Sequence, residues 1–388
     1  MKIAYIGNVG VSNTAPAIHV NNRARFMRLC GHQIYILCES HGLYNRMDDL
    51  TDIFYDYIKV FPSSKFFHFL FWNLDHIFGF IQFNVYKKHL FKIKPEIVIL
   101  YEPTSILFVE RIKKLGYKYG FKIIIESTEW RNPNDYKGFQ NYLINRQKDL
   151  QRRYYDFKPG NVIAISDYLY SHYLKNKCNV IKLPPLFELE ELPVSTINNR
   201  NGSKPIHIVF AGVLLSKDYI DTLISAIIDI NKNKINIIFD IIGPSKNSVE
   251  NMMGILDIKK FGIICHGKLS HDETLKIVAK SDFSVLLREN KLYAKAGVST
   301  KFCEAMCLGV PSICTKIGGT DSYIKNGVNG FLVKNNSKEE LLKILNVIIN
   351  LDNNDLIELK KSALETAEKN FVFDAYIEKF NVFLKNVS

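Results

Sequence analysis

The chain has 388 residues, 47% of them hydrophobic, so two domains with sizeable cores are expected. Its net charge of +12 predicts an anionic partner; because no helix-turn-helix, RNP or zinc-finger pattern is present, nucleic acid is the weakest candidate beside phosphorylated substrates and anionic membranes. The seven cysteines are odd in number and lack CxxC spacing, which argues against a disulfide framework and a zinc site.

The first half of the chain alternates strand and helix signals. Strands are predicted at Lys2–Ile6 and Ile34–Leu37 with a helix over 20–30 between them, which is a βαβ unit of a parallel sheet. The loop GNVGVSNTAPA after the first strand lacks the GxGxxG spacing of dinucleotide-binding proteins. The N-terminus MKIAYIG has neither the apolar core nor the cleavage site of a signal peptide, so a cytoplasmic location is expected. Further strands are predicted at Glu96–Leu100, Lys122–Ile125 and Asn161–Ile165.

Residues 60–94 are rich in phenylalanine and end in lysines. Polar residues such as Asp75 and Gln82 interrupt the run, so it is not an uninterrupted membrane span. Two interpretations remain open. The segment forms core helices of the first domain, or it forms a peripheral membrane surface with Lys87, Lys88 and the lysines at 92 and 94 near anionic headgroups.

A break in the pattern separates two halves. Prolines at 184, 185, 193 and 205, together with the polar run NNRNGSK, indicate an interdomain linker. Strands resume at Ile206–Phe210, Ile235–Ile242, Gly262–His266 and Phe283–Leu287. We predict a Rossmann-like domain over 1–190, a linker over 191–205, a second Rossmann-like domain over 206–370 and a C-terminal helical segment over 371–388.

The sharpest local signals lie between residues 282 and 333. Thr300–Leu308 has helical apolar spacing; Gly309 suits the left-handed position after a helix, and Pro311 prevents continuation into the strand expected at Ser312–Thr315. Ligands of open α/β sheets bind at the carboxyl ends of the strands, against helix N-termini. The loops of this segment are therefore expected to open onto a binding site.

Glu304 stands out because it lies inside this largely apolar helix. A carboxylate held there can accept hydrogen bonds from two adjacent hydroxyls, as a ribose presents them. The alternative is a salt bridge with Lys301, one turn earlier, although a lysine that precedes the glutamate is the weaker orientation.

The stretch STKFCEAMCLGVPSI, followed by GG and NGVNGFLV, resembles the nucleotide-sugar half of retaining family 4 glycosyltransferases with the GT-B fold. The family's Glu-x7-Glu signature is incomplete, because Glu304 matches its second glutamate and Ala296 occupies the position of the first. The pattern Arg-Glu-Asn, Ala-Gly, Thr-Lys-Phe and Glu is more similar to a branch typical of bacterial surface-polysaccharide assembly. The resemblance implies two Rossmann-like domains whose parallel sheets face a central cleft, with the last helix packed on the first domain.

The resemblance also implies site residues. The loop AGVLLSKDYIDTLISA resembles the family's phosphate-binding loop from Gly212, with Val213 at the usual arginine position and Lys217 as the candidate lysine, one residue short in spacing. A lysine there would neutralise charge on the departing nucleoside diphosphate. Arg288, directly after the central strand, is a second candidate for the diphosphate; pairing with Glu289 or another nearby acid is the alternative.

Other positions carry weaker implications. Donor contacts are expected from Gly10 in the first loop, from backbone near Gly297 and from Thr300, besides Glu304. Glu129 is the nearest match to a family histidine beside the reacting sugar; it would orient the acceptor or act on its hydroxyl, or it belongs to a helix-capping region. No Asp-x-Asp pair follows a strand, since Asp48, Asp49 and the Asp52 to Asp56 spacing fall in a stretch expected to be helical.

The expected activity is therefore hexosyl transfer with retention, from a nucleoside-diphosphate sugar to a hydroxyl of a glycan or lipid-linked glycan, without metal or cofactor. Three alternatives stay open. A nucleotide-sugar 2-epimerase has the same fold and needs no acceptor. A non-catalytic partner of another transferase would tolerate Ala296. A nucleic-acid binder would use the charge alone and bind any duplex in a salt-sensitive way.

Overall fold

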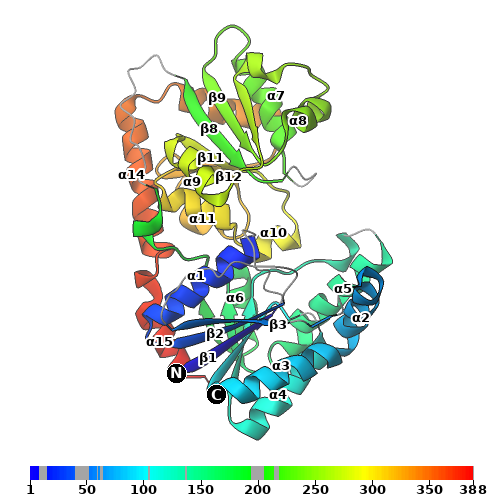
Figure 1. Cartoon of the computed structure of the whole chain (residues 1–388). Coiled ribbons are helices and arrows are strands. Elements are labelled where there is room, and N and C mark those ends of the chain that lie inside the picture. The colour runs from blue at the N-terminus through cyan, green and yellow to red at the C-terminus, as the bar shows by residue number, and fades with distance from the viewer. Residues whose placement is uncertain are drawn as a thin grey trace. The chain divides into compact units, whose positions relative to one another are not determined.

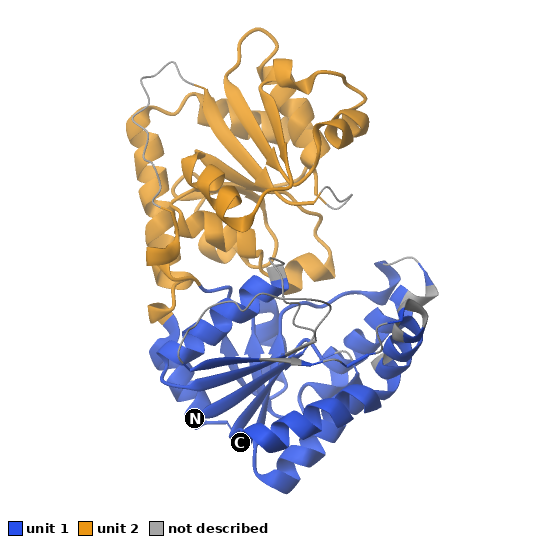
Figure 2. Ribbon diagram, viewed as in Figure 1, with its two compact units in different colours: residues 1–186, 376–388 blue, residues 187–375 orange. Residues whose placement is uncertain are grey.

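The computed structural model describes residues 1–7, 15–39, 52–58, 60–61, 64–103, 105–135, 138–193, 205–213 and 218–387. Contacts between residues divide the chain into two compact units (Figure 2). Unit 1 comprises residues 1–186 and 376–388, and unit 2 comprises residues 187–375. Each unit is built around a parallel sheet with helices, which confirms the predicted α/β fold class.

The sheet of unit 1 has the strand order β3-β2-β1-β4-β5-β6-β7, and every pair is parallel (Figure 1). Its strands are β1 (Lys2–Gly7), β2 (Gln33–Glu39), β3 (Ile53–Ile58), β4 (Ile97–Tyr101), β5 (Lys122–Ser127), β6 (Asn161–Ala164) and β7 (Asn179–Lys182). The order reverses between β1 and β4, and such a switch point is where open α/β sheets bind ligands.

Helices of unit 1 connect and cover these strands. They are α1 (Ala15–Leu29), α2 (Lys65–Phe78), α3 (Phe80–Ile93), α4 (Ile106–Tyr119), α5 (Phe139–Leu150), α6 (Asp167–Lys175) and α15 (Ile377–Lys385), with short turns η1 (Pro133–Asp135), η2 (Gln151–Tyr155) and η5 (Asp374–Tyr376). The C-terminal α15 packs beside β7 within unit 1, where the Asn179 side-chain amide lies 3.4 Å from the Phe383 carbonyl. The last helix is thus part of the N-terminal unit.

One predicted element of unit 1 is wrong. The stretch around Asp52 and Asp56 was expected to be helical, yet Ile53–Ile58 is the edge strand β3, paired in parallel with β2. Five of the six residues in IFYDYI are isoleucine, phenylalanine or tyrosine, which favour strands. Asp48 and Asp49 lie outside the described residues.

The sheet of unit 2 has the order β10-β9-β8-β11-β12-β13, again all parallel. Its strands are β8 (Ile206–Ala211), β9 (Ile237–Ile242), β10 (Ile263–Gly267), β11 (Phe283–Leu286), β12 (Ser312–Thr315) and β13 (Gly330–Val333). Its helices are α7 (Ile220–Ile230), α8 (Lys246–Met253), α9 (His271–Lys280), α10 (Leu292–Ala296), α11 (Thr300–Cys307), α12 (Thr320–Tyr323), α13 (Lys338–Ile349) and α14 (Asn353–Asn370), with turns η3 (Leu189–Glu191) and η4 (Ile258–Phe261). The strand order is that of unit 1 without its seventh strand.

The helix, the left-handed glycine and the strand predicted between residues 300 and 315 are confirmed in unit 2. Ser270 and Glu273 form a capping box at the start of α9. Helix α11 ends at Cys307, and Gly309 adopts a φ of 64° in the short connection to the strand β12. Cys303 and Cys307 are buried free thiols. These elements bring the carboxyl ends of β8, β11 and β12 to one edge of the sheet.

Candidate functional site

The backbone at the carboxyl end of β8 lies very close to the loop that follows β9. A methyl group on Gly243, whose φ is 114°, would lie 2.0 Å from the carbonyl oxygen of Gly212, so only glycine fits there. At the same place the Lys301 ammonium, carried by the first turn of α11, donates to the Ala211 carbonyl at 2.5 Å. The loop that resembles a phosphate-binding loop therefore begins beside a lysine. Sequence analysis had considered Lys301 only as a partner of Glu304.

The Glu304 side chain is buried in α11, with 10% of its surface exposed. Its Oε1 lies 3.4 Å from Nε2 of His271, but no donor in the described part of the chain makes a hydrogen bond to this oxygen. Burial raises the pKa of Glu304 to about 7, and the charge of Lys301 opposes this rise only in part. Burial also lowers the pKa of His271, which favours the neutral imidazole.

An unpaired buried carboxyl costs stability, since each buried polar group without a partner loses its hydration. Two adjacent hydroxyls of a ligand would supply the missing donors and favour the ionised carboxylate. The surroundings of Glu304 thus agree with the interpretation that it accepts hydrogen bonds from a ribose.

Arg288 follows β11 and is held by side-chain and backbone hydrogen bonds. Its Nε donates to Asp218 Oδ1 at 3.1 Å, its backbone amide donates to Thr315 Oγ1 at 3.0 Å, and its carbonyl accepts from the same hydroxyl at 3.1 Å. Asp218 and Arg288 also form a backbone bridge, which ties the loop after β8 to the loop after β11. The two loops converge at one sheet edge, as expected, and the guanidinium, 27% exposed, is paired with a nearby acid.

The positions around the start of α11 are tightly packed. Ala296 is fully buried at the end of α10, and the Gly297 amide donates to the Tyr293 carbonyl at 3.1 Å. A methyl on Gly318 would lie 2.2 Å from the Gly297 carbonyl oxygen. Thr300 is the first residue of α11, directly after the N-cap Ser299. The Gly297 amide is therefore used within the chain, and a donor contact from the backbone near it stays a prediction.

Two predicted site residues, Gly10 and Lys217, lie outside the described residues. Val213, at the position where relatives often have arginine, is 70% exposed.

In unit 1, Glu129 lies just beyond β5 and is committed to two cations. Its carboxylate accepts from Arg131 at 2.8 Å and from Lys148 at 3.1 Å. Burial alone would raise the pKa of Glu129, but the charges and hydrogen bonds of Lys148 and Arg131 outweigh it and hold the pKa at about 2. Such a carboxylate is a weak proton acceptor near neutral pH, which suits the orienting role better than that of a base.

The backbone beside Glu129 is held by Glu102, a residue whose role was not predicted from the sequence. Glu102 follows β4 with a φ of 44°, a rare conformation for a non-glycine residue. Its Oε1 accepts from the amides of Thr128 and Glu129 at 2.6 and 3.1 Å and from Arg152 at 2.6 Å. Arg152 in turn bonds Asp156 at 2.7 Å. The acid directly after the strand was the available signal, because strand ends of parallel sheets converge.

A second network in unit 1 surrounds Glu126 on β5, which is fully enclosed. Its carboxylate accepts from His19 at 2.9 Å, from Arg23 at 3.0 Å and from the Tyr5 hydroxyl. Burial alone would raise the pKa of Glu126, but the charge of Arg23 and the bonds from His19 and Tyr5 hold it at about 2. This carboxylate joins β1, α1 and β5 beneath the switch point.

Among the described residues, no three His, Cys, Asp or Glu side chains come together in a way that could hold a metal ion. The expectation of a metal-independent reaction stays a prediction.

Comparison with known proteins gives a family match for part of the chain. Residues 195–369 match the family model of glycosyl transferases group 1. An uncharacterized glycosyltransferase of Methanocaldococcus jannaschii is 25% identical over 339 residues, which cover 84% of this chain and 80% of the relative. The GtfA subunit of a UDP-N-acetylglucosamine–peptide N-acetylglucosaminyltransferase from Streptococcus agalactiae is 22% identical over 257 residues, covering 61% of this chain and 48% of that protein.

Solved structures share the fold. Sucrose-phosphate synthase of Thermosynechococcus elongatus superposes with a TM-score of 0.72 at 14% identity, over 99% of this chain and 98% of that one. Anabaena HepE in complex with UDP and glucose gives a TM-score of 0.70 at 14% identity, over 99% of both chains. WaaG, a glycosyltransferase involved in lipopolysaccharide biosynthesis, gives 0.67 at 14% identity over 100% of both. Together, these findings show a domain of the glycosyl transferases group 1 type over residues 195–369, in a chain that has the GT-B fold of these solved structures.

Proposed function

We propose that this glycosyltransferase moves a hexosyl group from a nucleoside-diphosphate sugar to a hydroxyl of a glycan or lipid-linked glycan acceptor, with retention and without metal. The observation that carries the proposal is Glu304, a buried carboxyl whose Oε1 has no hydrogen-bond donor among the described residues. It lies on the helix whose first turn also carries Lys301, at the carboxyl edge of the unit 2 sheet.

The proposed contacts follow from charge. The ribose hydroxyls donate to Glu304, while the diphosphate is met by Lys301, Arg288 and the N-terminal turn of α11, where the helix dipole favours anions. Negative charge that develops on the leaving diphosphate is stabilised by these groups in place of a metal. The leaving phosphate itself takes the acceptor proton, which is why no carboxylate is assigned as the base.

Surface polysaccharide synthesis is the proposed pathway. The motif pattern between 283 and 333 resembles that branch, and WaaG, which has the same fold, acts in lipopolysaccharide biosynthesis. UDP sugars are the first donors to test, because HepE of the same fold binds UDP-glucose.

The test is the affinity for UDP of Glu304→Gln, measured by calorimetry at pH 8. Loss of a charged acceptor is expected to weaken binding by about 1.5–3 kcal/mol, or roughly 10- to 150-fold, without lowering stability. Glu250→Gln is the matched control: its side chain is equally exposed at 10%, but it is already paired with Lys246 and the Ile258 amide. Glu250→Gln should leave UDP affinity unchanged. Equal UDP affinity of Glu304→Gln and the native chain would remove Glu304 from the donor site.

A further inference from the structure

We propose that unit 1 docks on an anionic membrane through the outer side of α2, α3 and α4, here called the aromatic–basic face. It is defined by the exposed aromatic residues Phe78, Phe80, Phe91 and Tyr119 and by the cations that contact them. Figure 1 shows the three helices together on one side of the unit 1 sheet. The inference concerns a partner of unit 1 and does not depend on the donor contacts proposed for unit 2.

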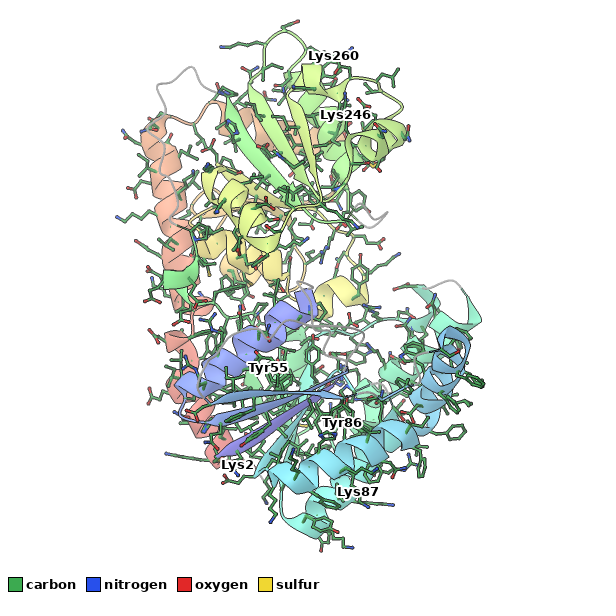
Figure 3. The ribbon with its side chains drawn as sticks, in the orientation of Figure 1. Lys2, Tyr55, Tyr86, Lys87, Lys246 and Lys260 are labelled. Atoms are coloured by element: carbon green, nitrogen blue, oxygen red, sulfur yellow. The ribbon has the colours of Figure 1, made fainter. Side chains whose placement is uncertain are left out.

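The segment 60–94 combines both interpretations left open by the sequence. On α3, Tyr86, Leu90 and Ile93 are buried against the rest of unit 1, so this side is core. The opposite side is not: Phe80 is 58% exposed and Phe78 at the end of α2 is 52% exposed. Figure 3 shows Tyr86 pointing toward the sheet and Lys87 pointing away from it. A single exposed apolar side chain is ordinary, but several in one patch indicate an interaction surface.

Side-chain contacts arrange the rings and cations of this patch in two groups. The Arg111 guanidinium donates to the Phe78 carbonyl and lies 5.6 Å from the centre of the Phe80 ring. Lys87 lies 5.6 Å from the Phe91 ring, which stacks edge-on with Tyr119 at 4.8 Å, and Lys118 lies 5.4 Å from that tyrosine ring. Cations and aromatic rings thus alternate across α3 and α4.

The acidic side chains of these helices are either buried or paired, so they add no unpaired negative charge to the aromatic–basic face. Helices α2, α3 and α4 contain two acidic residues, Asp75 and Glu110. Asp75 is buried and accepts from the amides of Ile81 and Gln82, at 2.6 and 3.0 Å, which joins α2 to α3. Glu110 pairs with Lys158 at 3.1 Å. The charge that remains on the outer side is positive.

The exposed aromatic rings and cations favour an anionic lipid surface as the partner of the aromatic–basic face. Aromatic rings and lysines are the side chains that settle at the headgroup level of a bilayer, and each basic residue near such a surface strengthens binding about fivefold. A second copy of the same face would place like charges against each other. No helix among the described residues is both long and apolar enough to cross a bilayer, and α2 and α3 have 14 residues each, so the contact is peripheral.

The experiment is vesicle flotation of the full chain. Vesicles of phosphatidylcholine alone are compared with vesicles of phosphatidylcholine and phosphatidylglycerol, at low and high salt. We expect binding to the anionic vesicles that falls as salt rises, because surface charge is screened. Equal binding to both vesicle types, or no binding to either, would overturn the proposal.

Two variants locate the contact. Lys87→Glu with Lys118→Glu, the two lysines that contact Phe91 and Tyr119, is expected to weaken binding to anionic vesicles about 25-fold or more, from about fivefold for each lysine. The matched control is Lys259→Glu with Lys260→Glu, two exposed lysines of unit 2 with the same charge change, of which Figure 3 labels Lys260. An equal loss in the control would assign binding to net charge and reject the face.

Phe78→Ser with Phe80→Ser tests the aromatic part. We expect this variant to lose vesicle binding while its melting temperature and its vesicle-free affinity for UDP stay native. If it instead abolishes a concentration-dependent dimer of the native chain, the face is an interface between copies and the membrane proposal is wrong. UDP affinity also separates the proposals, since a chain that binds vesicles but not UDP contradicts only the proposed donor site.

Discussion

Two buried glutamates, Glu126 in unit 1 and Glu304 in unit 2, have sharply different surroundings. Glu126 in unit 1 accepts from a tyrosine, a histidine and an arginine, and its pKa is held at about 2. Glu304 in unit 2 has an oxygen without a hydrogen-bond donor among the described residues, and burial raises its pKa to about 7. A carboxylate with all its partners inside the fold serves stability, whereas one that lacks them is available to a ligand.

The largest expected effect is on Glu126. Glu126→Gln keeps the shape of the side chain but leaves the charge of Arg23 without its partner in a buried site. Breaking a buried ion pair in this way costs on the order of 3–5 kcal/mol. We expect the urea midpoint of unit 1 to fall accordingly, while Glu304→Gln shows no loss. Near-native stability of Glu126→Gln would mean that the network is dispensable and would break the comparison.

The pH dependence of stability sharpens the same comparison. In the folded chain Glu304 keeps its proton up to about pH 7, whereas the unfolded chain loses it near pH 4.5. Between these values the folded state binds more protons, so this group lowers stability as pH rises, by about 3 kcal/mol in total. Gln cannot ionise, so Glu304→Gln is expected to be more stable than the native chain by up to about 3 kcal/mol at pH 8 and equal to it near pH 4.

Urea unfolding of both chains at the two pH values provides the measurement. Glu126 acts in the opposite direction, because its lowered pKa makes its contribution complete above pH 4.5 and lost as pH falls toward 2. A constant difference between Glu304→Gln and the native chain from pH 4 to 8 would show that Glu304 is ionised throughout.

Features that depend on residues close together in the sequence could be predicted, whereas contacts between residues far apart in the sequence could not. The strand, helix and cap signals between 282 and 333 are local, so the bounds of α11 and the left-handed Gly309 were predictable. The network of Glu126 joins residues 103 to 121 positions apart, and no spacing rule connects them. The helix expected at β3 gave more weight to the acids at 52 and 56 than to the isoleucine, phenylalanine and tyrosine residues around them, which favour a strand.

Side-chain direction was the second limit. The sequence placed Lys301 one turn before Glu304 and so suggested an ion pair within the helix. In the structure the Lys301 ammonium instead donates to the carbonyl of Ala211, which lies 90 residues earlier in the chain, at the end of β8. Likewise, the exposed and buried sides of α3 could be distinguished only after its packing against α4 was known. The resemblance suggested a role for Glu304, and the structure shows that its Oε1 has no hydrogen-bond donor among the described residues.

The smallest expected effect concerns Arg288, the cation that the fold already pairs. Its partner Asp218 directly follows Lys217, and the pair is largely buried, with 27% of the Arg288 side chain and 7% of the Asp218 side chain exposed. If Arg288 contacts the donor diphosphate, Arg288→Ala lowers kcat/KM about tenfold or more, whereas Asp218→Asn, which frees the guanidinium, changes it little.

A purely structural pair gives a different result, because removing either partner then disturbs the two loops equally. Lys217→Ala completes the test: with both cations on one diphosphate, the losses from Lys217→Ala and Arg288→Ala are expected to be non-additive, since groups that act on one charge are coupled. The measurement is a double-mutant cycle on kcat/KM, with Asp218→Asn as the matched control. Strict additivity, or equal losses for Arg288→Ala and Asp218→Asn, would place Arg288 with Glu126 as a residue that the fold has already satisfied.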